Sequence, residues 1–376
     1  MKIAVNTRLL LKNKLEGIGW FTYESLKRIT KEHPEHTFYF IFDRPYNEEF
    51  IFSDNIIPVV LSPQARHPFL FIIWFEISVK LYLSKLKPDI FLSPDGYLPL
   101  SSKIPSLAVI HDINFEHYPK DFPWIIKKYY KWFFPRFTRK ASRIATVSEF
   151  SKNDISKKYS IDLNKIDVVY NGVNDTYKVL SENEILISKE KFANGKQYFI
   201  FIGSLIPRKN LENLFNAFDN FKKTVTSDVC LLIVGEKKWW TKNIAKAFNK
   251  MEYKSDVIFC GRLEPKELNQ ALSSSLALVY ISYFEGFGIP IIEAFKCGTA
   301  VITSNVTSMP EIAGDAAIFV DPFNIIDISK AMNNIYSDKN LRSSLIEKGF
   351  IQMNKFSWDF TAQKLWLSIE KTISTK

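Results

Sequence analysis

The sequence has few cysteines and no long apolar run, and both shortages exclude whole classes of protein. Three cysteines among 376 residues are an odd number without metal-ligand spacing, so we expect buried thiols in a reducing compartment and not a disulfide framework. The longest uncharged apolar run, residues 67–75, is far shorter than the ~20 residues of a membrane-spanning helix. The first residues, with Ile3, Ala4 and Val5 in a row, predict a strand and not a signal peptide. We therefore expect a cytoplasmic protein, soluble or peripheral at the inner face of the cell membrane.

Glycine is also scarce, with 13 in the chain, and two of them fall between Glu285 and Glu293. The apolar run 275–281 before this segment predicts a buried parallel strand, and the residues after it predict a short helix that ends at Gly298. A strand, a glycine turn and a helix together direct free backbone N–H groups toward an anion. Two solvated acids beside a helix start would explain the carboxylates but not the glycines. The segment therefore predicts a site for an anionic ligand with polar groups at both ends, such as a nucleotide sugar.

Alternating strand and helix patterns divide the chain into two α/β halves. Strands are expected at residues 3–5, 37–42, 89–92, 106–111, 143–147 and 166–169, and in the second half at 198–202, 230–234, 257–260, 276–281 and 299–303. This alternation predicts two Rossmann-like, doubly wound parallel-sheet domains that face a cleft. We place them at residues 1–173 and 196–357, with a polar linker over 174–195. Residues 358–376 show helical spacing of apolar residues and are expected to pack back on the first domain.

The segment 120–143 combines positive charge with aromatic side chains. It has eight basic residues against one acid, Asp121, and its aromatic residues are interleaved with the lysines and arginines. Such a helix either packs its aromatic residues on its own domain or lies at an anionic membrane surface. Both interpretations stay open, and nucleic acid is the weakest of the three possible partners.

A series of motifs in fixed order resembles one known family. It is the large family of retaining, nucleotide-sugar-dependent glycosyltransferases called group 1 or family 4, which have the GT-B fold. The most specific motifs lie in the second half, and the first half adds weaker ones. The segments that carry the resemblance are 203–211, 232–236, 259–263, 285–293, 310–317 and 320–322, with 17–19, 111–112, 147–151 and 170–173 in the first half.

The resemblance implies roles for residues of the second half. Arg208 and Lys209 would bind the diphosphate of the donor, and Ser204 stands where many members have a further basic residue. Glu293 would bind the ribose hydroxyls and Glu285 the hydroxyls of the donor sugar. The remaining contacts would come from the backbone amides of Phe287, Gly288 and Ile289, and from Arg262 and Leu263 beside the base.

Residues of the first half would complete the site. By the same resemblance, Gly17 and Gly19 would form a loop that faces the donor phosphate, and His111, followed by Asp112, would point toward the sugar. A histidine at the end of a strand is by itself more often a structural hydrogen-bonding group. Its place in the series favours the functional interpretation.

Metal ligands are poorly represented in the sequence. No Asp-x-Asp pair occurs, and the five histidines lack the spacing of a zinc site. We therefore expect transfer without a metal or other cofactor. Retention of configuration is implied by the resemblance alone. Because no enzyme nucleophile is evident, we expect a same-face displacement assisted by the departing phosphate.

The identity of the substrates is the least specific prediction. The sequence of residues 285–315 resembles that of mannosyltransferases of surface polysaccharide and lipopolysaccharide synthesis. We therefore expect GDP-mannose as the leading donor and a glycan or lipid-linked glycan as the acceptor. A UDP- or dTDP-sugar donor is an alternative. From other classes, a nicotinamide-dependent dehydrogenase would need a third glycine near Gly17 and Gly19, and a non-catalytic nucleotide-sugar or membrane-binding module would bind the donor without transfer.

Overall fold

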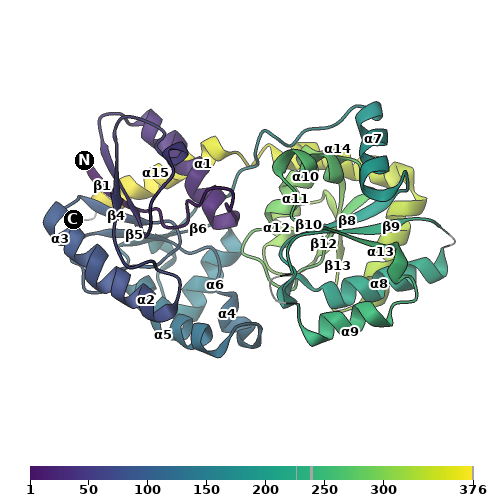
Figure 1. Ribbon diagram of the computed structural model, residues 1–376, viewed down its shortest axis with the longest axis horizontal. Helices are drawn as coiled ribbons and strands as arrows, with labels where there is room; N and C mark the ends of the chain where they lie inside the picture. Colours follow the sequence, from purple (N-terminus) through teal and green to yellow (C-terminus); the bar gives the residue numbers. More distant parts are fainter. Residues whose placement is uncertain (226, 238–239, 375–376) are drawn as a thin grey trace. The chain divides into compact units, whose positions relative to one another are not determined.

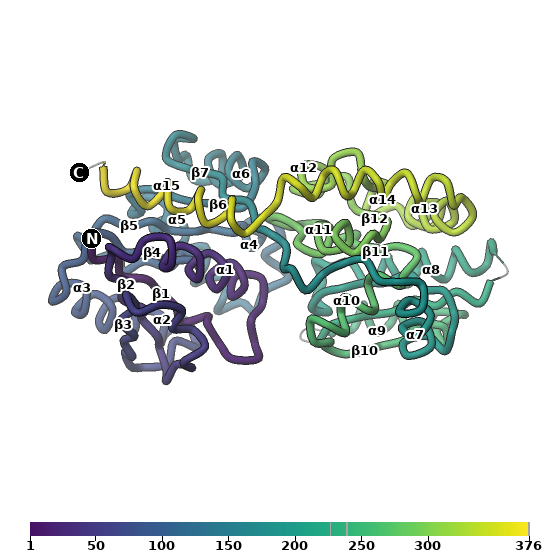
Figure 2. The backbone as a smooth tube through the Cα atoms, turned by 90° about the horizontal axis from the view of Figure 1, so that it is seen from above, coloured from purple at the N-terminus to yellow at the C-terminus, as the bar shows by residue number. Residues whose placement is uncertain are grey.

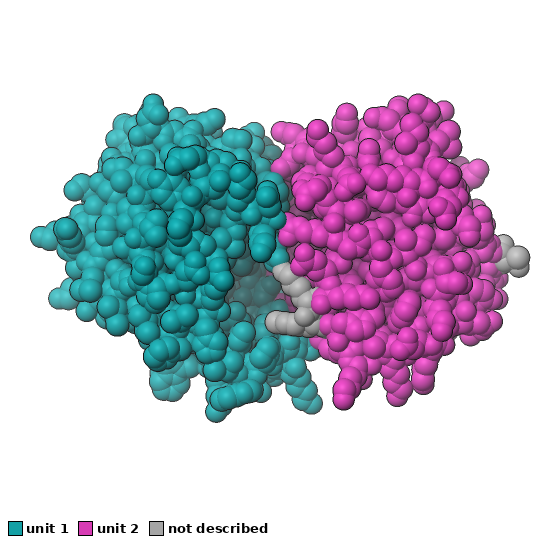
Figure 3. Space-filling model, in the orientation of Figure 1, with its two compact units in different colours: residues 1–172, 357–376 teal, residues 173–356 magenta. Residues whose placement is uncertain are grey.

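The computed structural model describes residues 1–225, 227–237 and 240–374, and the chain divides into two compact units. Unit 1 comprises residues 1–172 and 357–376, and unit 2 comprises residues 173–356 (Figure 3). Each unit has its own parallel sheet and its own hydrophobic core. The expectation of two doubly wound α/β domains is therefore confirmed.

Unit 1 is built on a seven-stranded parallel sheet in the order β3-β2-β1-β4-β5-β6-β7. Its strands are β1 (Lys2–Asn6), β2 (Thr37–Phe42), β3 (Ile56–Val60), β4 (Ile90–Ser93), β5 (Ser106–Val109), β6 (Arg143–Thr146) and β7 (Ile166–Val168). Its α-helices are α1 (Gly17–Glu32), α2 (Pro68–Ile73), α3 (Lys80–Leu86), α4 (Asn114–His117), α5 (Trp124–Lys140), α6 (Glu149–Tyr159) and α15 (Trp358–Ser374). The π-helix η2 (Trp74–Val79) joins α2 to α3, and the short 3-10 turns are η1 (Glu48–Phe50), η3 (Pro119–Asp121) and η4 (Leu163–Lys165). Helices α1 and α15 cover one face of the sheet, and α2 and α5 lie on the other (Figure 1).

Unit 2 has a six-stranded parallel sheet in the order β10-β9-β8-β11-β12-β13. Its strands are β8 (Tyr198–Ile202), β9 (Cys230–Val234), β10 (Val257–Gly261), β11 (Ala277–Tyr280), β12 (Ala300–Ser304) and β13 (Ala317–Val320). Its helices are α7 (Glu182–Ala193), α8 (Leu211–Thr224), α9 (Lys242–Lys250), α10 (Pro265–Ser273), α11 (Ile289–Lys296), α12 (Met309–Ala313), α13 (Ile325–Ser337) and α14 (Lys339–Met353), with the turns η5 (Pro207–Lys209) and η6 (Lys254–Asp256). The central strands are buried on both faces, which explains their continuous apolar sequences.

The strand order reverses direction once in each sheet. In unit 1 the reversal lies between β1 and β4, and in unit 2 between β8 and β11. At such a point the connections leave toward opposite faces, and a crevice opens at the carboxyl ends of the two strands. Residues that follow these four strands therefore lie where a ligand is expected to bind.

Helix α15 returns from unit 2 and completes unit 1. It lies beside α1 in both backbone views (Figures 1 and 2). Two ties fix it: Arg28 of α1 pairs with Asp359 at 2.5 Å, and the Thr361 hydroxyl donates to the Tyr170 carbonyl at 2.7 Å. Gly172 allows the entry, because a Cβ there would lie 2.2 Å from the backbone nitrogen of Trp358.

The segment 174–195, expected as a linker, is an integral part of unit 2. It contains α7, whose Ser181 and Glu184 form a reciprocal capping box. Lys191 of α7 also pairs with Glu267 of α10 at 2.8 Å. The cysteines differ from expectation in one respect: Cys230 and Cys297 are buried, but Cys260 is half-buried, and all three are free.

Candidate active site

The polar residues predicted to act together in unit 2 follow the two strands at its point of reversal. Strands β8 and β11 are hydrogen-bonded neighbours, with Ile200 opposite Leu278. Turn η5 follows β8 and brings Arg208 and Lys209 to this edge, while Glu285 follows β11. Residues 76 positions apart in the sequence therefore meet at one place.

Glu285 forms ion pairs with both basic residues. Its Oε2 lies 2.6 Å from Arg208 Nη1, and its Oε1 lies 2.6 Å from Lys209 Nζ. Lys209 also donates to the Tyr280 hydroxyl at 2.5 Å. The Arg208 guanidinium donates to the Phe284 carbonyl at 3.1 Å. One carboxylate thus positions two cations before any ligand arrives.

The electrostatics of this cluster favour the charged state of Glu285. Burial by itself would raise the pKa of the carboxyl group, but Arg208 and Lys209 outweigh that effect and lower the pKa to about 2. The Tyr280 phenol has a pKa well above its ordinary value, first because of burial and then because of the Glu285 charge. The cluster thus holds two cationic side chains in place at the strand ends, where an anionic ligand would need positive charge.

The turn after Glu285 is held by the segment that precedes α12. The Ser308 hydroxyl donates to the carbonyls of Glu285 and Phe287 at 2.9 and 3.0 Å. Gly288 has φ = 103° and starts helix α11, with Pro290 in the first turn. A Cβ at Gly288 would also lie 3.1 Å from the Ile291 side chain. The turn therefore needs glycine, and it directs the first N–H groups of α11 outward along the helix axis.

Glu293 lies one turn into α11 and is separate from the Arg208–Lys209–Glu285 cluster. Its carboxyl group is half-buried and bonds to the Tyr177 hydroxyl. Burial raises the pKa of Glu293 to about 7. Among the described carboxyl groups of unit 2, only Glu293 has a pKa raised to near neutral pH, and its hydrogen-bond partner, Tyr177, is uncharged.

The remaining predicted residues of unit 2 lie along the same edge of the sheet. Ser204 follows Gly203, the residue after β8, and Arg262 and Leu263 follow β10 at the edge of the sheet. Arg262 is exposed. Since β9 separates β10 from β8, Arg262 starts about 10 Å from the end of β8. Ser204 therefore lies in the same loop after β8 as Arg208 and Lys209, and Arg262 and Leu263 lie farther along the edge.

Gly203 and Gly235 allow close approach of two strand ends at this edge. A Cβ at Gly235 would lie 1.9 Å from the Gly203 carbonyl oxygen. The Gly235 N–H donates to the Gly261 carbonyl at 2.7 Å. Both glycines have a positive φ, 150° and 144°.

His111 of unit 1 follows β5 and is held in a defined orientation. Its Nε2 bonds to the Pro94 carbonyl at 2.9 Å, and its ring packs edge-on against Phe21 at 5.1 Å. Because a carbonyl only accepts, Nε2 carries the proton and Nδ1 is the acceptor. Burial lowers the pKa of His111, so the neutral form prevails. Asp112 accepts from the backbone N–H of Asn114 at 3.0 Å, where it starts α4.

Gly17 and Gly19, predicted as a loop, lie instead in the first turn of α1. The first intrahelical bond there runs from the Trp20 N–H to the Glu16 carbonyl at 2.8 Å. The N–H groups at the start of a helix have no acceptor within it. Gly19 is tightly enclosed, because a Cβ would lie 3.2 Å from the Leu9 carbonyl.

One cluster of unit 1 was missed by sequence reasoning. Arg8 follows β1 and Asp95 follows β4, so both stand at the reversal of the first sheet, and they pair at 2.6 Å. Asn6 also donates to Asp95 at 2.8 Å. The Arg8 guanidinium lies over the rings of Tyr97 and Phe71, 4.6 and 5.0 Å from their centroids. Its only sequence signal is a polar residue shortly after each of two buried strands.

The basic, aromatic segment 120–143 contains α5, which has two kinds of aromatic residue. Tyr129, Phe134 and Phe137 are buried in the core of unit 1. Trp124 and Trp132 are 64% and 59% exposed. Lys128 and Arg136 lie over these two indoles, at 4.9 and 3.7 Å. The helix therefore packs on its own domain and also presents tryptophans and cations to the surface.

Among the described residues, no helix is both long and apolar enough to cross a membrane.

Two family descriptions match the chain, one in each half. Glycosyltransferase Family 4 matches residues 15–177, and Glycosyl transferases group 1 matches residues 182–352. The predicted resemblance is therefore confirmed.

Sequence relatives and a solved structure agree with these families. The chain is 28% identical to O-antigen chain mannosyltransferase B of Escherichia coli over 74% of its own length and 73% of the relative's. It is 31% identical to O-antigen chain mannosyltransferase RfbU of Salmonella typhimurium, over 60% of the chain and 59% of that relative. WaaG, a glycosyltransferase involved in lipopolysaccharide biosynthesis, has a similar fold, with a TM-score of 0.75 and 14% identity over 97% of this chain and 98% of WaaG.

Proposed function

The chain belongs to the glycosyltransferases that combine a family 4 amino-terminal domain with a group 1 carboxyl-terminal domain, and we propose that it transfers mannose from a nucleotide diphosphate to a surface glycan. Both relatives described above carry the name O-antigen chain mannosyltransferase. Their names support mannose as the sugar and a glycan chain as the acceptor. GDP as the nucleotide and a lipid-linked form of the glycan are parts of the proposal that rest on the sequence resemblance. A UDP- or dTDP-sugar is the alternative donor.

The observation that carries this proposal is the Arg208–Glu285–Lys209 cluster at the reversal of the second sheet. Breaking the anomeric bond develops negative charge on the departing diphosphate, and preorganised cations stabilise that charge most effectively. We assign this role to Arg208 and Lys209. Glu285 holds both cations and accepts a hydrogen bond from a hydroxyl of the donor sugar.

The other residues receive binding roles. The amides of Phe287, Gly288 and Ile289 at the start of α11 bind phosphate and sugar oxygens. Glu293 accepts hydrogen bonds from the two ribose hydroxyls, and the Ser204 hydroxyl donates a hydrogen bond to a phosphate oxygen. The base of the nucleotide lies toward the edge of the sheet, where it would contact Arg262 and Leu263.

Residues of unit 1 act on the donor sugar and its phosphate. The N–H groups at Gly17 and Gly19 bind phosphate oxygens, and neutral His111 binds the sugar, with Asp112 fixing the turn after it. The Arg8–Asp95 pair, under its aromatic rings, suits a sugar of the acceptor, because sugars offer both hydroxyls and apolar C–H faces. The acceptor oxygen attacks the face from which the diphosphate leaves, so the configuration is retained.

We further propose that the reaction needs no metal ion and that α5 holds the enzyme at the cytoplasmic face of an anionic membrane. The exposed Trp124 and Trp132, each under a cation, are suited to the interface between headgroups and acyl chains. Exposed Phe69 and Ile72 of the neighbouring α2 extend the apolar part of this surface. Flotation with anionic vesicles tests this, with Trp124→Ala/Trp132→Ala as the variant, and equal flotation of both proteins would refute it.

The decisive experiment combines a thermal-shift panel with a transfer assay. GDP, UDP and dTDP with their hexoses are tested for stabilisation, and radiolabelled GDP-mannose is offered with a mannose-terminated acceptor, with and without EDTA. Lys209→Met is compared with Lys246→Met, which changes an exposed lysine of α9. We expect stabilisation by GDP, EDTA-resistant transfer, and loss of both binding and transfer in Lys209→Met only. Binding without transfer or hydrolysis would support a non-catalytic module, and full transfer by Lys209→Met would refute the assignment.

A further inference from the structure

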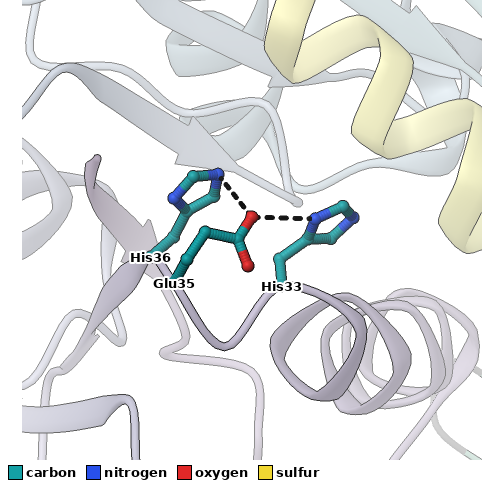
Figure 4. A group of neighbouring side chains, drawn as sticks. All are labelled: His33, Glu35 and His36. Carbon is teal, nitrogen blue, oxygen red and sulfur yellow. Dashed lines mark ion pairs between the residues drawn. The ribbon is translucent and has the colours of Figure 1, made fainter.

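Three potential metal ligands converge on the turn between α1 and β2 of unit 1. They are His33, Glu35 and His36, whose ligand atoms all lie within 4.8 Å of one another (Figure 4). Glu35 Oε1 lies 3.5 Å from His33 Nδ1 and 3.2 Å from His36 Nε2. From this geometry we propose that the turn binds a divalent transition metal ion, and zinc is the ion that we expect there.

The distances suit a tetrahedral ion. Zinc binds imidazole nitrogen and carboxylate oxygen at about 2.0–2.2 Å, so two of its ligands lie about 3.4 Å apart. The two separations from Glu35 bracket that value. Two imidazoles and one carboxylate form a ligand set that zinc uses with water in the fourth position. The third separation, between the ligand nitrogens of His33 and His36, is within 4.8 Å.

The turn itself prepares the site. The His36 N–H donates to the His33 carbonyl at 3.2 Å, so residues 33–36 form a β-turn with Pro34 at its second position. Proline favours that position because its φ is already fixed. In such a turn the first and fourth residues lie close together, here His33 and His36. Both histidines therefore face Glu35 without the entropy loss of ordering a flexible loop.

Helix α15 supplies a floor that orients the two rings. The Trp366 indole stacks on His33, with centroids 3.6 Å apart and planes 16° apart, and it also lies parallel to His36 at 5.3 Å. The imidazole planes differ by only 6°. His36 Nδ1 faces the Met1 amine at 3.2 Å, which leaves Nε2 for the ion. Packing of this kind fixes the direction of metal-binding nitrogens.

The site is distinct from the proposed reaction centre. It lies at the carboxyl end of α1, whereas Gly17 and Gly19 lie at the amino end of the same helix. With 16 residues in α1, the two ends are about 24 Å apart. The ion would join the end of α1 to the start of β2 beside α15, so we infer a stabilising role for it in unit 1. This inference does not depend on the proposed function.

Isothermal titration with ZnCl2, on tag-free protein stripped of metal, tests the proposal. We expect one ion per chain and a rise in melting temperature with zinc. His33→Asn and His36→Asn should each weaken binding about 100-fold, since even loss of an indirect partner costs 10–100-fold. Glu35→Gln should also weaken it. His67→Asn changes an exposed histidine elsewhere in unit 1 and should bind like the parent.

Cobalt provides a second readout that does not depend on stability. Co2+ bound by two imidazoles and one carboxylate in a tetrahedral site should give visible absorption, and the His33 and His36 variants should lack it. Absence of zinc binding at millimolar concentration would overturn the proposal. Equal binding by the parent and the His33→Asn and His36→Asn variants would overturn it as well, because the ion would then lie elsewhere.

Discussion

Replacing Glu285 by glutamine tests the central cluster most directly, because it keeps the shape and removes the charge. The carboxyl group has a pKa of about 2 in the folded chain against an ordinary value of 4.5. A difference of about 2.5 pKa units corresponds to about 3 kcal/mol of stability at neutral pH. Breaking a buried ion pair by removing one partner costs a similar amount, about 3–5 kcal/mol. Arg208 keeps some access to water, with 21% of its side chain exposed, so we expect the lower end, about 3 kcal/mol at pH 7.

The pH dependence separates this charge effect from a simple packing defect. Since the folded pKa is lowered, the stabilisation is complete above pH 5 and is lost as the pH falls toward 2. The free energies of unfolding of the parent and Glu285→Gln should therefore differ by about 3 kcal/mol at pH 7 and by only about 2 kcal/mol at pH 3.5. Urea titrations followed by fluorescence and circular dichroism at both pH values measure this difference.

The control for this measurement is Glu267→Gln. Glu267 pairs with Lys191 at 2.8 Å on the surface of the same unit. Surface pairs contribute little, so this variant should unfold like the parent. A Glu285→Gln protein of parental stability, or one whose defect is the same at both pH values, would refute the electrostatic account of the cluster.

Three further predictions concern unit 2. Lys209→Met should lower kcat/KM for transfer at least 100-fold, because the departing diphosphate loses a cation that is worth about 3 kcal/mol in the transition state; steady-state kinetics beside Lys246→Met check this, and a tenfold or smaller loss would contradict it. Glu293→Gln should stabilise the ligand-free protein by about 1–2 kcal/mol at pH 8 but not at pH 4.5, because burial raises the pKa of Glu293 from 4.5 to about 7, so that stability is lost as the pH rises from 4.5 to 7 and the loss is complete at pH 8; thermal melts at the two pH values decide it, and a pH-independent effect would count against it. Gly235→Ala should cost about 3 kcal/mol or more, because its Cβ would meet the Gly203 carbonyl at 1.9 Å; soluble expression and urea unfolding measure it, and parental stability would show that the two strand ends separate freely.

Much of the fold could be predicted because periodicity and buried runs are local signals. The strands at residues 37–42, 198–202 and 230–234 lie as expected. Strand β3 was missed because Pro58 interrupts it and two of its five residues are exposed, as an edge strand permits. Helix α7 was missed although Ser181 and Glu184 have the spacing of a capping box, because its polar surface suggested a linker.

The interactions within the candidate site could not be predicted in the same way. The sequence placed Arg208, Lys209 and Glu285 after strands, but their ion pairs depend on β8 and β11 being neighbours. Strand order is a property of the whole sheet and has no local signature. The same holds for Arg8 and Asp95, which are 87 positions apart. The turn at His33 and His36 is different, because its ligands are close in sequence but match no common zinc spacing.

The return of α15 to unit 1 has a consequence for the order in which the molecule is made. Residues 1–172 lack their last helix until residues 357–376 have been synthesised, after the whole of unit 2. At 5–20 residues per second this delay is about ten to forty seconds. During that time the side of α1 that Trp366 and its neighbours will cover is exposed to water. This surface is where we expect a chaperone to bind the nascent chain.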